Sequence, residues 1–182
     1  MLRRELLLIA ALLKPAAAAD SVAAGKLLVA TTQSHDPELA RSVVLLVHLD
    51  EQGGIGLIVN RRADVPLSRL LPGVSQKAAS VPVYFGGPVP IGARALYRSP
   101  RKLNNALRIF GNVYLIADLP ILQTMAGSTK PDVFRIYAGY TGWSAGQVRN
   151  EIQRGLWRVL PGDARVVFDP HPESVWERMG GR

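Results

Sequence analysis

Residues 42–60 read SVVLLVHLDEQGGIGLIVN and contain the pattern that predicts the fold class. Residues 42–49 are β-branched and apolar at successive positions, which predicts a strand buried on both faces. The polar stretch at 50–54 is typical of a turn, and residues 55–60 form a second apolar run. Two such runs on either side of a short polar turn predict a β-hairpin.

The same kinds of signal recur along the rest of the chain. Further strands are predicted at residues 25–32, 81–85, 106–109, 113–116, 133–140 and 166–168. Helices are predicted at residues 66–71, 119–126, 145–154 and 172–179. Hairpins with a few inserted helices indicate an α+β domain built on a mixed, largely antiparallel sheet.

The composition is that of one folded domain. A chain of 182 residues can bury one hydrophobic core, and 48% hydrophobic with 20% charged residues is ordinary for a globular protein. A net charge of +8 is typical either of a protein that binds a polyanion or of one with a solvated basic surface. The arginines are scattered along the sequence, which favours the solvated basic surface. Cysteine is absent from the sequence, which excludes disulfides, thiolate nucleophiles and iron–sulfur sites.

The N-terminus has the layout of a secretory signal peptide. Residues 1–20 read MLRRELLLIAALLKPAAAAD, with a basic start, an apolar run and small residues before Asp20. The apolar run is too short for a transmembrane span, which needs about 20 residues. Because Glu5, Lys14 and Pro15 interrupt the pattern, an N-terminal tail is the alternative. We predict a leader at 1–19 and one domain at 20–182, periplasmic if the leader is cleaved and cytoplasmic if it is not.

One segment resembles a catalytic motif. Residues 142–146 read GWSAG, which matches the G-x-S-x-G turn of serine hydrolases between a predicted strand and a predicted helix. Asp163, Asp169 and His171 follow in the order that these enzymes use. In this interpretation His171 would deprotonate Ser144, and an aspartate would orient the imidazole.

A helix start explains the same segment without catalysis. Ser144 followed by Gln147 is typical of a capping box, in which the hydroxyl accepts the Gln147 N–H and the amide reaches back. Trp143 and Val148 occupy the two positions of a hydrophobic staple. The sequence favours the helix start, and we predict no catalytic residue.

No pattern for a metal or cofactor is present in the sequence. The three histidines are far apart, so a histidine-based metal site is not expected. Residues 53–56 read GGIG but are not followed by the helix that a phosphate-binding loop requires. We therefore predict neither a metal nor a cofactor.

Four motifs in order and spacing resemble the YqgE/AlgH family. The chain carries DPELARSV at 36–43, a glycine-flanked apolar strand ending at Asn60, GGPV at 86–89, and GYTGW at 139–143 followed by Gly146-Gln147, Glu151-Ile152 and Trp157. The similarity runs from about Gly25 to Trp176. The chain departs from the family pattern at Leu39, Arg62 and Arg149, and in its leader, because family members are mostly cytosolic.

The resemblance implies a fold more than an activity. It implies a bent sheet that forms a partial barrel with peripheral helices. The family has no established reaction or catalytic residues, and its transcriptional-regulator label is not matched by a DNA-binding motif here.

From the residues and the resemblance together we predict a non-enzymatic binding or regulatory domain with an unknown protein or small-molecule partner. The alternatives are a regulator that contacts nucleic acid, if cytosolic, and a serine hydrolase using Ser144. The glycine clusters indicate either a structural corner or a pocket lined by N–H groups and aromatic rings. The candidate pocket or family-motif residues are Asp36, Pro37, Arg41, Ser42, Asn60, Gly86, Gly87, Pro88, Gly139, Tyr140, Gly142, Trp143, Gly146 and Gln147.

Overall fold

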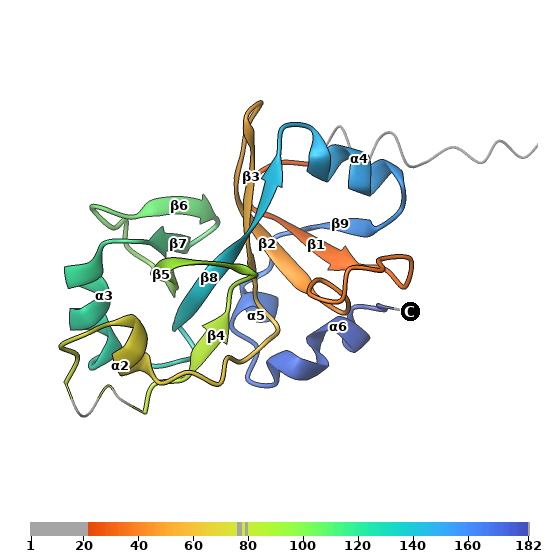
Figure 1. Cartoon of the computed structure of the whole chain (residues 1–182). Coiled ribbons are helices and arrows are strands. Elements are labelled where there is room, and N and C mark those ends of the chain that lie inside the picture. Colours follow the sequence, from red (N-terminus) through yellow and green to blue (C-terminus); the bar gives the residue numbers. More distant parts are fainter. Residues whose placement is uncertain (1–21, 76–77, 79, 182) are drawn as a thin grey trace, which may run out of the picture.

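Residues 22–75, 78 and 80–181 are described by the computed structural model, and their strands form one bent sheet (Figure 1). The strand order is β6-β7-β5-β8-β3-β2-β1-β9, and β4 pairs with β8 outside this path. All the strand pairs are antiparallel except β4–β8. The strands are β1 (Lys26–Ala30), β2 (Val43–Leu49), β3 (Gly53–Ile58), β4 (Val83–Phe85), β5 (Val89–Arg98), β6 (Leu107–Phe110), β7 (Val113–Ile116), β8 (Phe134–Ser144) and β9 (Trp157–Pro161).

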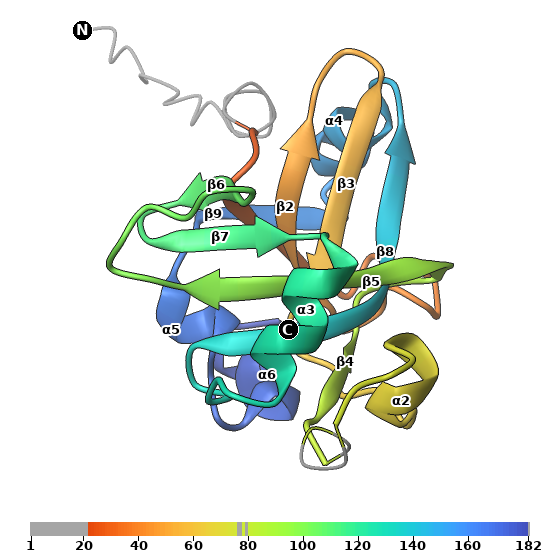
Figure 2. The same cartoon turned by 90° about the vertical axis from the view of Figure 1, so that its left-hand side faces the viewer.

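Short helices lie around the edges of this sheet (Figure 2). They are α2 (Leu67–Leu70), α3 (Leu119–Ala126), α4 (Gln147–Gln153), α5 (Ala164–Val167), η2 (Pro172–Ser174) and α6 (Val175–Arg178). The longest, α3, begins where the Asp118 carboxylate accepts the Ile121 N–H at 3.0 Å. The α+β class and the largely antiparallel bent sheet that forms a half-barrel are confirmed.

The β2–β3 hairpin is confirmed, and β2 is buried on both faces. Val43, Leu45 and Val47 belong to one hydrophobic cluster, whereas Val44 and Leu46 belong to another. Alternate side chains of a strand point to opposite faces, so an apolar run with no polar alternation can fill two cores.

Strand β8 gives the sheet its bend. Its first half pairs with β4 and β5, and its second half pairs with β3. Gly139 lies between the two halves with φ +67°, in the left-handed region that favours glycine. The strand therefore continues through a backbone change and serves both halves of the sheet.

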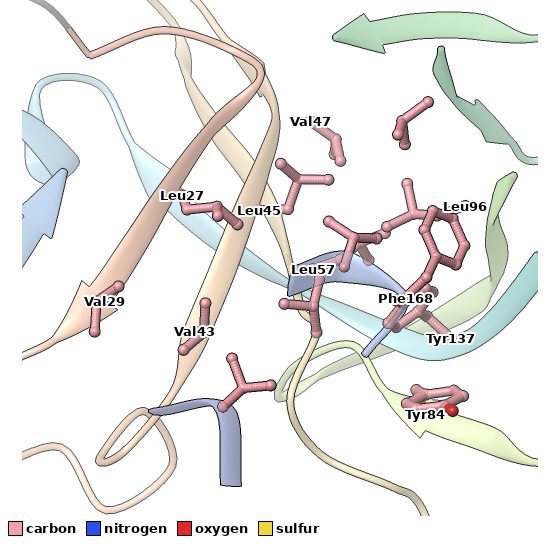
Figure 3. Packing of buried hydrophobic residues seen from close by; sticks show 14 of the residues in the cluster. Leu27, Val29, Val43, Leu45, Val47, Leu57, Tyr84, Leu96, Tyr137 and Phe168 are labelled. Carbon is pink, nitrogen blue, oxygen red and sulfur yellow. The ribbon is translucent and has the colours of Figure 1, made fainter. Parts of the chain in front are cut away.

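The main core fills the inside of the bend. Figure 3 shows Leu27, Leu45 and Leu57 facing Leu96 and Tyr137 from the other half of the sheet. A second cluster packs against α4, and a third packs against α2 and α3.

Two local predictions were wrong, and two strands were missed. Residues 166–168 are not a strand, because Asp163 accepts the Arg165 N–H at 2.8 Å and begins the short helix α5. Strands β5 and β9 were not predicted. Helix α4 begins two residues later than predicted, because β8 extends to Ser144 and Gly146 has φ +71°.

The predicted leader at 1–19 lies outside the described residues. None of the helices within the described ranges is both long and apolar enough to cross a membrane.

Candidate functional site

The predicted site residues do not form one site but fall into three groups. The first group lies around the start of β2 and consists of Asp36, Pro37, Arg41, Ser42 and Asn60. The second group lies where the segment between β4 and β5 meets β8 and consists of Gly86, Gly87, Pro88, Gly139 and Tyr140. The third group lies between the end of β8 and the start of α4 and consists of Gly142, Trp143, Gly146 and Gln147.

Asn60 holds the start of β2 in place. Its side-chain oxygen accepts the Val43 N–H at 2.8 Å, and its amide donates to the Arg41 carbonyl at 2.9 Å. Asp36 closes the preceding loop by accepting the Glu38 N–H at 2.9 Å. The side chain of Asn60 is buried, and both its bonds go to backbone, so this part of the motif is a structural clamp.

The other residues of this group also have structural surroundings. Arg41 pairs with Glu177, and its guanidinium lies 5.0 Å from the Trp176 ring centroid, which ties the loop to α6. Ser42 is fully buried, and Pro37 is exposed.

Two tryptophans share one carboxylate at the α4 corner. The indole N–H groups of Trp143 and Trp157 donate to the same oxygen of Glu151, at 2.9 Å and 2.8 Å. Gln147 donates to the other Glu151 oxygen at 2.9 Å. The two indoles meet edge to face with centroids 6.1 Å apart. Because Trp143 is 6% exposed and its donor is satisfied, it is a core residue and not an open binding ring.

The capping box predicted at Ser144 is wrong, because Ser144 is the last residue of β8 and the N-cap of α4 is Gly146, which makes no side-chain cap hydrogen bond. The Gln147 side-chain oxygen accepts both the Ser144 N–H, at 3.0 Å, and the Ser144 hydroxyl, at 3.1 Å. Trp143 and Val148 are buried in the same cluster, but with Gly146 as the N-cap they do not occupy the two positions of a hydrophobic staple. The predicted bond from the Gln147 N–H to the hydroxyl is not among the hydrogen bonds of the described residues.

The segment that carries His171 lies away from Ser144. Figures 1 and 2 show α4 at one end of the molecule and α5 and α6, which flank His171, at the other. The His171 N–H donates to the Asp169 carboxylate at 2.9 Å. Nothing in this geometry supports the hydrolase alternative.

Replacing Ser144 with alanine is therefore expected to have little effect. Among the described residues its exposed hydroxyl bonds one neighbouring side chain, that of Gln147, so the loss in unfolding free energy should be within about 0.5 kcal/mol. Chemical denaturation measures this loss, and a fluorophosphonate probe should label neither protein. Labelling of the wild type that disappears in Ser144→Ala would contradict the structural role.

At the centre of the motif groups, two backbone segments cross at contact distance. We call this the glycine crossing: residues 86–88 between β4 and β5, against Gly139 and Tyr140 of β8. The Gly86 N–H donates to the Ala138 carbonyl at 2.8 Å. A Cβ on Gly86 would lie 2.3 Å from the Gly139 carbonyl oxygen, and one on Gly87 would lie 2.3 Å from the Tyr140 carbonyl carbon. These positions therefore have no room for a side chain.

An apolar hollow of about 560 Å³ opens beside the glycine crossing. Strand β5 changes register against β8 between Val89 and Ala93, and Ile91 in this stretch is 62% exposed. The residues lining the apolar hollow are Ala63, Val65, Arg69, Leu70, Phe85, Gly87, Pro88, Pro90, Gly92, Ala138 and Gly139.

A more polar hollow of about 470 Å³ includes the β2–β3 turn and Tyr140. The His48 ring and the Asp50 carboxylate lie 2.9 Å apart at its rim. The Gln52 N–H donates to the Asp50 carboxylate, and this hydrogen bond is the main reason that the pKa of Asp50 lies below its usual value. The Arg94 guanidinium covers Tyr140, 4.5 Å from the ring centroid. Tyr140 therefore has one face occupied by a cation.

The side chains that could hold a metal are dispersed. Within residues 22–75, 78 and 80–181, no three His, Asp or Glu residues gather closely enough to bind a metal ion.

Sequence reasoning did not find the apolar hollow. Its walls come from segments far apart in the chain, and several of its lining residues, such as Val65, Leu70 and Phe85, belong to no motif. The Pro and Gly residues at 86–92 were the available signal, because they mark a segment that cannot pair regularly.

Comparison with known proteins gives a consistent family. A family model described as AlgH-like matches residues 27–182. A UPF0301 protein of Azoarcus sp. (strain BH72) is 35% identical over 81% of both chains, and one of Burkholderia vietnamiensis is 33% identical over 85% of this chain and 84% of its own.

Solved structures agree with the family match. The AlgH protein of Pseudomonas aeruginosa superposes with a TM-score of 0.72 at 29% identity, over 87% of each chain. A protein of Corynebacterium diphtheriae, at 24% identity, has a TM-score of 0.68 over 87% of this chain and 85% of its own, and shows the shared fold.

Proposed function

This chain belongs to the AlgH-like family, and on that premise we propose that it is a non-enzymatic binding domain. The apolar hollow beside the glycine crossing takes an extended apolar segment of a partner protein. The observation that carries the proposal is the combination, in one place, of apolar side chains with a stretch of β5 that is irregularly paired.

The size and chemistry of the apolar hollow suit an apolar guest. Its volume of about 560 Å³ lies within the range of about 300–1,000 Å³ that is usual for ligand sites. Phe85, Leu70 and Val65 supply the apolar wall, and Pro90 and Gly92 of β5 also line the hollow. Burial of these side chains on binding would supply the favourable free energy.

The backbone of the β5 segment suits an extended guest. Its pairing with β8 is interrupted between Val89 and Ala93, and β7 pairs with β5 only from Ala95 onward. An exposed strand can accept a partner segment as an added strand, with side chains entering the neighbouring hollow.

The nucleic-acid alternative has less support at this hollow. Arg69 is the one cation among the described residues that line it. Binding to a phosphate chain depends on several Lys or Arg contacts, each of which releases counterions. A regulatory role for this domain would then consist of holding a partner protein.

Peptide selection tests this proposal even though the partner is unidentified. Random peptides displayed on phage are selected on the wild-type domain, and the enriched peptides are measured on two variants. Val65→Ser removes a half-buried valine from the lining of the hollow, and Val74→Ser removes a half-buried valine that packs against the same hydrophobic cluster but does not line the hollow. We expect Val65→Ser to weaken binding by about tenfold, and Val74→Ser to leave it unchanged.

Both valines are half-buried against the same cluster, so the two substitutions should lower the stability by similar amounts. Equal loss of binding in both variants would show general stickiness and contradict the proposal. Enrichment of acidic peptides whose binding collapses with added salt would instead favour a polyanion site.

A further inference from the structure

A separate pocket of about 490 Å³ lies between β4, the start of β8 and the segment after α5. Its lining differs from that of the apolar hollow, and we call it the arginine pocket. Figure 3 shows Tyr84, Tyr137 and Phe168 gathered at this side of the core. The residues lining the arginine pocket are Arg62, Pro82, Tyr84, Lys130, Pro131, Asp132, Arg135, Phe168 and Pro170.

Arg135 is a buried charge in the wall of this pocket. Its side chain is 2% exposed, donates to the Val167 carbonyl at 2.9 Å and also donates to the Asp169 carbonyl. The guanidinium lies 4.5 Å from the Tyr84 ring centroid and 5.9 Å from that of Phe168. Its Nε has no hydrogen-bond partner among the described residues.

The charge of Arg135 is not neutralised by a carboxylate. None of the ion pairs within the described residues includes it, and the Asp169 carboxylate pairs with Arg178 at 2.7 Å. Burial raises the pKa of the Tyr137 hydroxyl above its usual range, so this neighbour stays neutral. Carbonyl dipoles and ring faces solvate the guanidinium in part, but a buried charge without a counter-charge is costly.

Two exposed cations stand at the rim of the same pocket. The Arg62 guanidinium lies 5.6 Å from the Tyr84 ring centroid, and Lys130 also lines the pocket. Asp132 is the acidic residue among the lining residues that the structure describes. Three cations against one carboxylate, around aromatic and proline surfaces, make a positive site with apolar walls.

We propose that the arginine pocket binds a small organic anion with a flat apolar body, such as an aromatic carboxylate. The ring of the guest lies against Tyr84, Phe168 and the prolines, and the anionic group faces Arg135 and the rim cations. This site is independent of the apolar hollow, so the loss of one would not remove the other.

Three compounds of nearly equal shape test the proposal: benzoate, benzamide and benzamidinium. The full-length protein is titrated with each while its amide NMR spectrum is recorded. We expect benzoate to bind at least about tenfold more tightly than benzamide, with benzamidinium weakest, because they differ chiefly in charge. The shifts should centre on residues 82–84, 130–135 and 168–170. Equal affinity of the anion and the amide, or shifts elsewhere, would overturn the proposal.

Rim variants keep the test decisive even if Arg135→Met fails to fold. Arg62→Gln and Lys130→Gln each remove an exposed cation from the pocket, whereas Arg154→Gln removes an exposed cation near α4. We expect each rim variant to weaken benzoate binding about three- to tenfold while benzamide binding stays unchanged. If Arg154→Gln weakened benzoate binding equally, the attraction would depend on the overall charge of the protein, which would contradict a specific pocket.

Discussion

Gly139→Ala is expected to lower the free energy of unfolding by about 3–5 kcal/mol, or to prevent folding, because the new methyl group has no space. Its Cβ would lie 2.5 Å from the Val89 carbonyl oxygen and 2.8 Å from that of Gly87. Both neighbours are backbone atoms, so neither can rotate away. The left-handed backbone at this position adds strain for any residue other than glycine.

Gly146→Ala is the matched control for this prediction. Gly146 has φ +71°, close to the +67° of Gly139, but a Cβ there would have no atom within 4 Å. It should therefore cost only the backbone strain, about 1–2 kcal/mol. Urea denaturation of both variants measures the difference. Equal losses of unfolding free energy in Gly139→Ala and Gly146→Ala would contradict the close backbone contact at the glycine crossing.

Trp143→Ala is the second large effect, with an expected loss of about 3–5 kcal/mol, as is usual when a buried aromatic side chain is removed. The indole packs in the cluster with Trp157, lies over Gly54 and Gly56, and donates to Glu151. The substitution empties this space and takes one of the two indole donors from the Glu151 carboxylate.

Trp143→Phe separates the two contributions. It keeps an aromatic ring but removes the donor, so the loss should fall to about 1–3 kcal/mol. Equilibrium unfolding followed by circular dichroism measures both variants. At temperatures where Trp143→Ala remains folded, it should bind the selected peptides as the wild type does. Weakened peptide binding with unchanged stability would show that Trp143 contacts the ligand.

The parts of the fold that were predicted correctly are those with local signals. The β2–β3 hairpin follows from an apolar run, a turn and a second apolar run in adjacent positions. Helix α3 has its own Pro and Asp signals at its start. Such patterns depend on neighbours in sequence, so the chain alone reveals them.

The elements that were missed depend on distant partners. Strand β5 contains Pro90, Gly92 and Arg94, which break the alternation expected of a strand, and it pairs with β8, which lies much later in the chain. Val166 and Val167 have β-branched side chains that favour strands, but the cap at Asp163 makes this segment helical.

The same distinction applies to the candidate site. The glycine motifs were correctly seen as special backbone, but whether they made a corner or a pocket depended on what lies opposite them. Gly87 faces the backbone of Tyr140 and Thr141, which no local pattern encodes. The charge of Arg135 gave no motif either, because its meaning comes from burial.

The most direct test of the account is an amide NMR titration of the domain with a peptide selected on it. We predict shifts concentrated at Phe85, Gly87, Gly92, Ala138 and Gly139, which surround the apolar hollow. Residues of the arginine pocket should not move in this titration. Shifts that instead spread over the exposed arginines, or centre on α4, would contradict the assignment of binding to the hollow beside the glycine crossing.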